Sequence, residues 1–240
     1  MEIVSRPIAP GINQTDFAQK WRMGDFKVTE EQMMAELQLM ALGDIAPLSI
    51  KIDTAAYDRE IAQFNNDWIP YLPRTDRVNN RDALTVLTYP GFTHKQSPSL
   101  LEISKNVGRR VKETECGNPT AVFDACPSLH PILKLFPSLG RSFLVRCHMG
   151  GYFVPHRDHP ELNRDVFRVL VFLKNCKRYE YDFIFEDRAI EIEEGRAYVV
   201  NTRKTHRTFS FVDNSTHLIM NIPVTMENAL IVLSNLQHRH

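Results

Sequence analysis

The sequence predicts a mostly β fold, in which a jelly-roll core follows an N-terminal helical flank. Short β-branched or aromatic segments separated by turn residues recur after residue 140, a pattern typical of a sandwich or barrel. Two helix signals fall in the first 80 residues. A chain of 240 residues with 43% hydrophobic content can bury one full core. We therefore expect a single domain over 1–240, with a helical and loop flank over 1–80, a jelly-roll core over 81–225 and a C-terminal tail over 226–240.

The first predicted helix begins after Thr29. Gln32 follows Thr29 by three residues, and this spacing indicates a capping box at a helix N-terminus. We expect the methionines that follow to pack in the core rather than to form a cofactor site. The apolar residues at helical spacing are Met33, Met34, Leu37, Met40 and Ala41.

A second amphipathic helix is expected over Asp53–Asn65. It would place Tyr57, Ile61 and Phe64 on one face. The aromatic and proline-bearing stretch Trp68–Pro73 is expected to form an ordered loop.

The core begins with an expected strand at Ala83–Tyr89, and short helices are expected at Ser99–Arg109 and Pro131–Phe136. Asp213–Ser215 has the residues of a tight turn. The other expected strands are short and rich in β-branched or aromatic residues, and the leading architecture for them is a double-sheet jelly roll. They are Ser142–Cys147, Val166–Leu173, Tyr181–Phe185, Ala197–Asn201, Arg207–Val212 and Thr216–Ile222.

Composition limits the class of partner. Lys and Arg together number 29, as do Asp and Glu, so the formal net charge is zero and no global field favours nucleic acid or an anionic membrane. No apolar run approaches the roughly 20 residues that span a bilayer, and Met1–Pro10 has no apolar signal-peptide core. The four cysteines show no CxxC spacing, so we expect buried, reduced thiols in a cytoplasmic protein. The sequence does not indicate the oligomeric state.

The segment 155–158 (Pro-His-Arg-Asp) carries the most specific chemical signal. It follows an apolar run, so His156 and Asp158 are expected at a strand end, where alternate residues point to the same face. His206 follows a later predicted strand, after a segment long enough to return across a jelly roll. Two imidazoles and one carboxylate on one face of a metal form the facial triad of non-haem iron oxygenases. We therefore expect these three residues to bind one metal ion; the alternative is a surface loop.

Two other histidines lie close to this segment in the sequence. His159 is a competing ligand, but the proline that follows it favours a turn. We interpret His148 as a hydrogen-bonded core histidine rather than as part of the metal site.

Two arginines interrupt apolar strands. Arg168 lies within Val166–Leu173, and Arg146 lies ten residues before His156. A charge in such a strand must be paired, or it is desolvated at a cost. At a strand edge the side chain can extend to water, whereas inside a cavity it can bind a carboxylate through two parallel hydrogen bonds. Because its strand follows the His-x-Asp segment, we favour the second interpretation for Arg168.

These features together resemble the aspartyl/asparaginyl β-hydroxylase-like family, and within it the bacterial proline hydroxylases. The resemblance covers roughly residues 140–224, and the preceding half matches only loosely, at residues 80–84. Arg146 also falls where the proline hydroxylases carry an arginine. The segments that carry the resemblance are Pro155–Asp158, Glu161-Leu162, Phe167–Val169, Gly195–Asn201 before His206, and His217–Ile222.

The resemblance implies a double-stranded β-helix, cupin-like, with Fe(II), 2-oxoglutarate and O2 as metal, cosubstrate and oxidant. It implies hydroxylation of an unactivated C–H bond in an amino acid, a peptide side chain or a related small molecule, with release of succinate and CO2. By position, His156, Asp158 and His206 match the family's metal ligands, and Arg168 matches an arginine that contacts the cosubstrate.

One departure from the family concerns the far carboxylate of 2-oxoglutarate. The family usually binds it with an arginine about ten residues after the distal histidine, but here Ser215, Thr216 and His217 occupy that neighbourhood. His217 and Arg146 are the two candidate replacements: His217 lies on the right strand, and Arg146 supplies a charge that does not titrate.

Two other functions fit the same residues. A metal-binding cupin could use the triad for non-oxygenase chemistry, because divalent metals share these ligands. A non-catalytic β-sandwich binding module would leave His156 and Asp158 as surface residues. We also expect part of Trp68–Arg81 to form a lid, from its composition and the loose resemblance.

Overall fold

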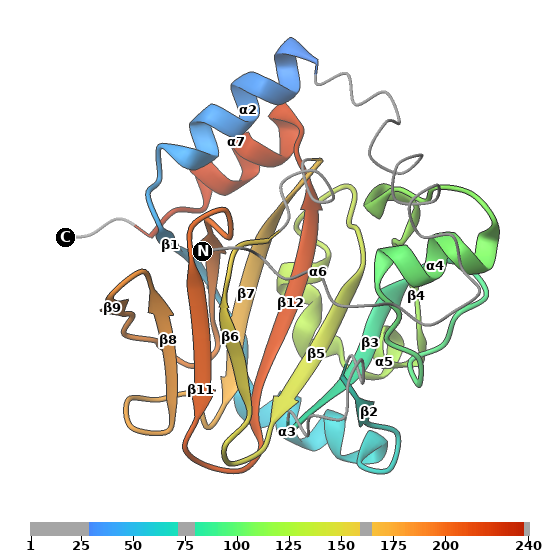
Figure 1. The fold of residues 1–240 in the computed structure, drawn as a ribbon, viewed down its shortest axis with the longest axis vertical. Helices are drawn as coiled ribbons and strands as arrows, with labels where there is room; N and C mark the ends of the chain where they lie inside the picture. Colours follow the sequence, from blue (N-terminus) through green and yellow to red (C-terminus); the bar gives the residue numbers. More distant parts are fainter. Residues whose placement is uncertain (1–28, 72–79, 159–164, 238–240) are drawn as a thin grey trace, which may run out of the picture.

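The computed structural model describes residues 29–71, 80–158 and 165–237. Two antiparallel sheets face each other (Figure 1). The larger sheet has the order β1 (Ile45–Lys51), β10 (Arg196–Val200), β7 (Val166–Lys174), β12 (Ser215–Pro223), β5 (Ser142–Cys147), β3 (Arg81–Thr88) and β2 (Ile69–Pro70), with β4 (Asn118–Pro119) also paired to β3. The smaller sheet has the order β6 (Tyr152–His156), β11 (His206–Ser210), β8 (Tyr181–Phe185) and β9 (Arg188–Ala189).

The strands β5 to β12 form a jelly roll, as the sequence predicts. Along the chain, β5, β7, β10 and β12 join the larger sheet, and β6, β8, β9 and β11 join the smaller one. The four strands in each sheet are contiguous, so the chain winds between two facing sheets as a double-stranded β-helix. Strand β1 extends the larger sheet beyond β10, and β3 and β2 extend it beyond β5.

The larger sheet has two differently used faces. Its inner face meets the smaller sheet around a cluster of buried aromatic and aliphatic side chains, including Phe143, Phe172 and Phe183. Its outer face, with Leu144 and Val171, packs against helices. These include α2 (Glu30–Met40), α3 (Thr54–Ile61), α5 (Ala121–Ala125), α6 (His130–Leu133) and α7 (Met226–Ser234), whereas α4 (Leu100–Val107) packs on a separate small cluster.

Several local predictions are confirmed. The Thr29 and Gln32 capping box begins α2, and Asp53 caps α3, which continues as a 3-10 turn over Ala62–Phe64. Strands β5 and β8 match their expected bounds residue for residue. All four cysteines are free and buried.

The expected packing of the α2 methionines is wrong. Only Ala35 and Leu39 of this helix are buried, because that stripe alone faces α7 and the sheet edge. The remaining apolar side chains are 45–55% exposed: Met33, Met34, Leu37 and Met40.

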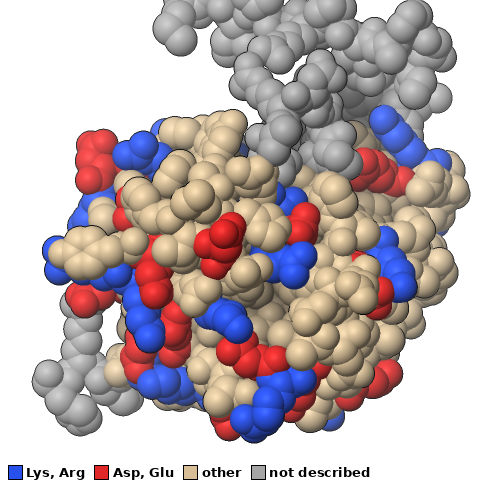
Figure 2. All heavy atoms as spheres, turned by 90° about the horizontal axis from the view of Figure 1, so that it is seen from below, with Lys and Arg blue, Asp and Glu red and all other residues tan. Residues whose placement is uncertain are grey.

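Several elements were not expected, among them β1, β4, β9, α5 and α7. Strand β1 pairs with β10 at the sheet edge despite Pro47, and the first nine residues of the expected C-terminal tail form helix α7 beside α2 (Figure 1). No helix in the described ranges has the length and apolar character to cross a membrane. On the face seen in Figure 2, acidic and basic side chains are interspersed rather than gathered by sign.

Candidate metal centre

Strands β6 and β11 are neighbours in the smaller sheet, and they bring His156 and His206 directly opposite each other. The two ring centroids lie 4.3 Å apart. Asp158 lies two residues beyond His156, and its backbone N–H donates to Thr202 O at 2.9 Å. The three side chains offer ligand atoms that all lie within 4.8 Å of one another, and no other such group of His, Cys, Asp and Glu occurs within the described ranges. The structure thus brings together all three residues expected to bind the metal.

The tautomer of both histidines is fixed by the backbone. His156 Nδ1 lies 2.7 Å from Val154 O, and His206 Nδ1 lies 3.0 Å from Lys204 O. A carbonyl oxygen can only accept, so each Nδ1 carries a proton, and the neutral form of each ring then has its lone pair on Nε2. A metal-binding histidine needs this form, and the carbonyl also fixes the ring orientation.

The charge states also suit a divalent cation. Burial lowers the pKa of His206, which favours the neutral imidazole that a metal requires. Burial opposes ionisation of Asp158, but the Arg168 guanidinium, a hydrogen bond from Thr202 and the two neighbouring histidines together hold the pKa of that carboxyl below its ordinary value. Arg168 Nε lies 2.6 Å from Asp158 Oδ2. Arg168 therefore points into the barrel beside the triad and keeps the carboxylate anionic.

His217 also faces the interior. Its ring lies 5.7 Å from Tyr181, 5.9 Å from Phe172 and 6.3 Å from Phe153, measured between ring centroids. Burial, and then the positive charge of Arg81, lowers the pKa of His217 to about 3. The imidazole is neutral at physiological pH, so it can supply a hydrogen bond but not a charge.

The structure does not bring Arg146 to these residues. Its neighbours Val145 and Cys147 face the inner cluster, so Arg146 projects from the opposite face of the larger sheet. There it pairs with Asp82 at 2.7 Å and lies 4.4 Å from the Trp68 ring centroid. A cation on this face is separated from the metal ligands by the sheet itself.

His148 is not a core residue. Its side chain is half-buried, and its Nε2 lies 2.9 Å from Asp82 Oδ2, beside Arg146. It therefore belongs to the outer-face ion-pair group. His159 and residues 72–79 of the expected lid lie outside the described residues.

The barrel interior contains a further polar group, Asn221, to which the sequence analysis assigned no role. Asn221 is fully buried opposite Arg168, and neither Nδ2 nor Oδ1 has a hydrogen-bond partner within the described ranges. His217 Nδ1 is likewise buried without a described partner. Buried polar groups in proteins are nearly always paired with protein or with ordered water, so these atoms form a polar surface inside the barrel. The alternation of His217, Ile219 and Asn221 on one strand was the available signal.

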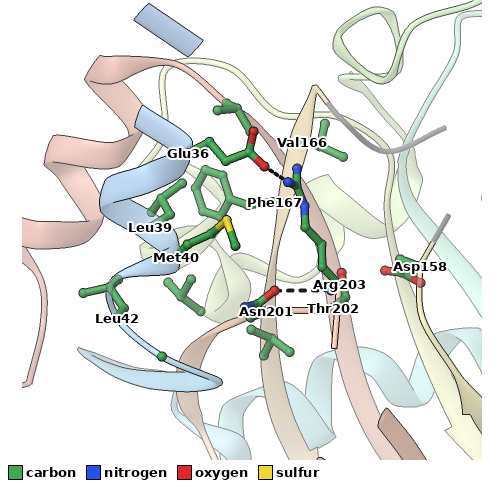
Figure 3. Close-up of a pocket in the computed structure, with 14 residues that line it drawn as sticks. Glu36, Leu39, Met40, Leu42, Asp158, Val166, Phe167, Asn201, Thr202 and Arg203 are labelled. Atoms are coloured by element: carbon green, nitrogen blue, oxygen red, sulfur yellow. Dashed lines mark hydrogen bonds and ion pairs between the residues drawn. The ribbon is translucent and has the colours of Figure 1, made fainter. Parts of the chain in front are cut away.

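A separate pocket lies on the other side of Asp158, between α2 and the ends of β7 and β10 (Figure 3). Figure 3 shows Glu36 of α2 paired with Arg203 across its mouth, and Leu39, Met40 and Phe167 on its walls. Its volume is about 50 Å³, far below the several hundred cubic ångströms of a typical ligand site. The pocket is therefore a small gap between α2 and the sheet, and it is too small to hold a substrate of ordinary size.

Three solved structures illustrate what the chain is similar to. One is a prolyl-4-hydroxylase of Pseudomonas putida, at 11% identity and a TM-score of 0.45, covering 79% of this chain and 99% of that one. Another is a prolyl hydroxylase from Trichoplax adhaerens in complex with a hypoxia inducible factor peptide fragment, at 9% identity and a TM-score of 0.44, covering 89% and 99%. A third is a 2OG-Fe(II) oxygenase family oxidoreductase from Burkholderia pseudomallei, at 15% identity and a TM-score of 0.40, covering 84% and 95%.

No family model and no curated protein matches the chain. The structural likenesses are too weak to carry an argument about function. The function must therefore be argued from the residues of the site.

Proposed function

We propose that this protein is an Fe(II)- and 2-oxoglutarate-dependent dioxygenase that hydroxylates an unactivated C–H bond of an amino acid, a peptide side chain or a related small molecule. The observation that carries the proposal is the convergence of His156, Asp158 and His206, with ligand atoms within 4.8 Å of one another. Two imidazoles and one carboxylate on neighbouring strands match the facial triad, which leaves metal positions open for other ligands.

The donor set fits a divalent metal such as Fe(II). The two Nε2 lone pairs are set by backbone carbonyls, and the carboxylate is kept anionic by Arg168. With 2-oxoglutarate and O2, the bound metal would supply hydroxylation of a C–H bond, with release of succinate and CO2. The chain supplies the placement of the reactants and the exclusion of water.

Aromatic side chains form the apolar wall of the site. The His206 ring stacks on Phe185 at 5.6 Å, and the His156 ring stacks on Phe153 at 6.3 Å. Such a wall excludes water and strengthens the electrostatic interactions between the bound groups.

Arg168 and His217 are the proposed cosubstrate contacts. A guanidinium has five N–H donors, so the contact with Asp158 leaves others for a carboxylate near the metal. His217 adds a neutral hydrogen-bonding group deeper in the barrel. The finer assignment, to aspartyl/asparaginyl β-hydroxylase-like enzymes, is supported by the motif resemblance over residues 140–224.

The test is a succinate-release assay with Fe(II), ascorbate, 2-oxoglutarate and a panel of amino acids and short peptides. We expect succinate formation that requires Fe(II) and is stimulated by one substrate class. Stoichiometric metal binding without 2-oxoglutarate turnover would instead favour a cupin with other metal chemistry. Failure to bind any divalent metal after reconstitution would favour a non-catalytic binding module.

A further inference from the structure

The inner face of the larger sheet carries a second arginine, Arg81, at the start of β3. Arg81 pairs in register with Cys147 of β5, and Ala83, two residues further along the same strand, belongs to the inner cluster. Because alternate residues share a face, Arg81 projects to the inside. Its guanidinium carbon lies 3.8 Å from the Phe153 ring centroid and 5.3 Å from that of Tyr71. This half-buried cation thus reaches the barrel interior from a strand outside the eight-stranded core.

Arg81 lies level with the start of β12. Ser215 of β12 pairs with Cys147 of β5, and Cys147 pairs with Arg81 of β3, so the three residues form one row across the sheet. His217 lies one inward-facing position further along β12, opposite Val145.

Two hydrogen-bonding groups, the Tyr181 hydroxyl and the His217 imidazole, interact electrostatically with the Arg81 guanidinium. Burial, and then the Cys147 thiol, raises the pKa of Tyr181, so its hydroxyl stays protonated and able to donate. Within the described ranges, His217 Nδ1 has no hydrogen-bond partner, and the Tyr181 hydroxyl lies beside the Thr208 and Cys147 side chains. A cation beside a phenol and a neutral imidazole is a suitable environment for one carboxylate.

The separation from the metal ligands suits a five-carbon dicarboxylate. The Phe153 ring centroid lies 3.8 Å from the Arg81 guanidinium carbon and 6.3 Å from the His156 ring centroid, so Arg81 and His156 lie within about 10 Å of each other. The terminal carbons of an extended five-carbon acid are about 5 Å apart, from bond lengths of about 1.5 Å. The metal–ligand bond at one end of the acid and the charge-assisted hydrogen bond at its other end account for the remaining distance.

We propose that Arg81 binds the far carboxylate of the dicarboxylate cosubstrate, with the hydroxyl of Tyr181 and the imidazole of His217 as its hydrogen-bonding companions. This inference rests on the proposed function, because it assumes that the metal-bound ligand is a 2-oxo dicarboxylate. The cation comes from β3 and replaces the arginine that the sequence lacks on β12. Arg146 is excluded by its position on the opposite face of the sheet.

The test removes the Arg81 guanidinium from the protein and, separately, the far carboxylate from the ligand. Binding of 2-oxoglutarate and of 2-oxopentanoate, which has the same chain length but no far carboxylate, is measured by calorimetry on the Mn(II)-loaded protein. We expect the parent to prefer 2-oxoglutarate by about 10- to 100-fold, as for a charge-assisted hydrogen bond. In Arg81→Gln that preference should fall below about threefold, with 2-oxopentanoate affinity unchanged.

Two further variants complete the design. Arg81→Met keeps an unbranched side chain over Phe153, and it gives the same comparison if the glutamine variant folds poorly. Arg146→Gln removes a positive charge from the neighbouring strand but from the other face, and it should keep the parent's preference. Thermal melting and Mn(II) stoichiometry check that each variant folds and binds metal.

Each outcome bears on a different claim. An undiminished preference in both Arg81 variants overturns the inference, and so does a loss of preference in Arg146→Gln alone. If the parent binds Mn(II) but neither 2-oxo acid, the proposed function fails and the inference falls with it.

Discussion

His156 and His206 lie directly opposite each other on β6 and β11, and Nδ1 of each lies within hydrogen-bonding distance of the backbone carbonyl two residues earlier. The same local contact thus fixes the orientation of both rings, and it leaves both Nε2 atoms available to a metal. The pairing register of two strands far apart in the sequence creates the site.

Replacing His206 with Ala should abolish metal binding without unfolding the protein. The side chain supplies one of three ligands, and losing a ligand should weaken the site more than the 10- to 100-fold typical of a supporting hydrogen bond. Metal content after Fe(II) or Mn(II) reconstitution is the measurement, with circular dichroism for the fold. His148→Ala is the matched control, because that side chain pairs with Asp82 on the opposite face. Equal metal content in His206→Ala and the parent would show that His206 does not bind the metal.

Replacing Arg168 with Lys should raise the KM for 2-oxoglutarate by about tenfold or more, because lysine lacks the planar fork that binds a carboxylate twice. The charge beside Asp158 is kept, so metal binding should change little. Steady-state kinetics and metal content together separate the two effects. Arg188→Lys, at an exposed position on β9, is the control. An unchanged KM in Arg168→Lys would contradict the proposal that Arg168 binds 2-oxoglutarate.

His217 should make the protein less stable as pH falls. Its pKa is about 3 in the folded protein, against about 6.5 in an unfolded chain, so the unfolded state binds the extra proton first. The contribution of the neutral imidazole is therefore fully present above about pH 6.5, and it is lost as pH falls toward 3, with a slope of up to about 1.4 kcal/mol per pH unit. Urea unfolding of the parent and of His217→Gln between roughly pH 4.5 and 7.5 measures this contribution to the free energy of unfolding. Parallel profiles for the two proteins would contradict the assignment.

Replacing Asn221 with Leu should stabilise the ligand-free protein. The buried amide has no described partner on either atom, and an unsatisfied buried polar group costs about 1–3 kcal/mol. Leucine has a similar volume, so the melting temperature should rise while binding of the interior ligand weakens. Asn228→Leu is the contrasting variant, because the Asn228 amide donates to Pro223 O at 2.8 Å and its loss should destabilise the protein. A fall in the melting temperature of Asn221→Leu would show that the amide is satisfied.

The cosubstrate affinity should stay flat between about pH 6.5 and 9. His217 is already neutral across that range, and an arginine does not titrate there. Calorimetry of 2-oxoglutarate binding to the Mn(II)-loaded parent at several pH values measures it. An affinity that weakens as pH rises would point to a protonated His217 as the anchor.

The sequence alone determined the local features of this protein. The Thr29 capping box, the bounds of β5 and β8, the turn at Asp213–Ser215 and the shared face of His156 and Asp158 each depend on residues within a few positions of one another. Spacing and residue type are enough for such features, because the backbone periods of strands and helices are fixed. His206, the third proposed ligand, was also predicted from the sequence, since it follows a predicted strand at a plausible distance.

Only the tertiary structure decided which face of the large sheet each charge occupies. Arg146 and Arg168 gave the same signal, a lone arginine in an apolar strand, yet Arg146 pairs with Asp82 outside the barrel and Arg168 with Asp158 inside it. Arg81, in the half of the chain that resembles the family only loosely, reaches the interior. A strand has two faces, and a shift of one residue in register exchanges them, so the choice depends on pairing with strands far away in the sequence. The same reason explains the exposed α2 methionines: helical spacing defines a stripe, but the packing of α7 and the sheet selects the stripe that is buried.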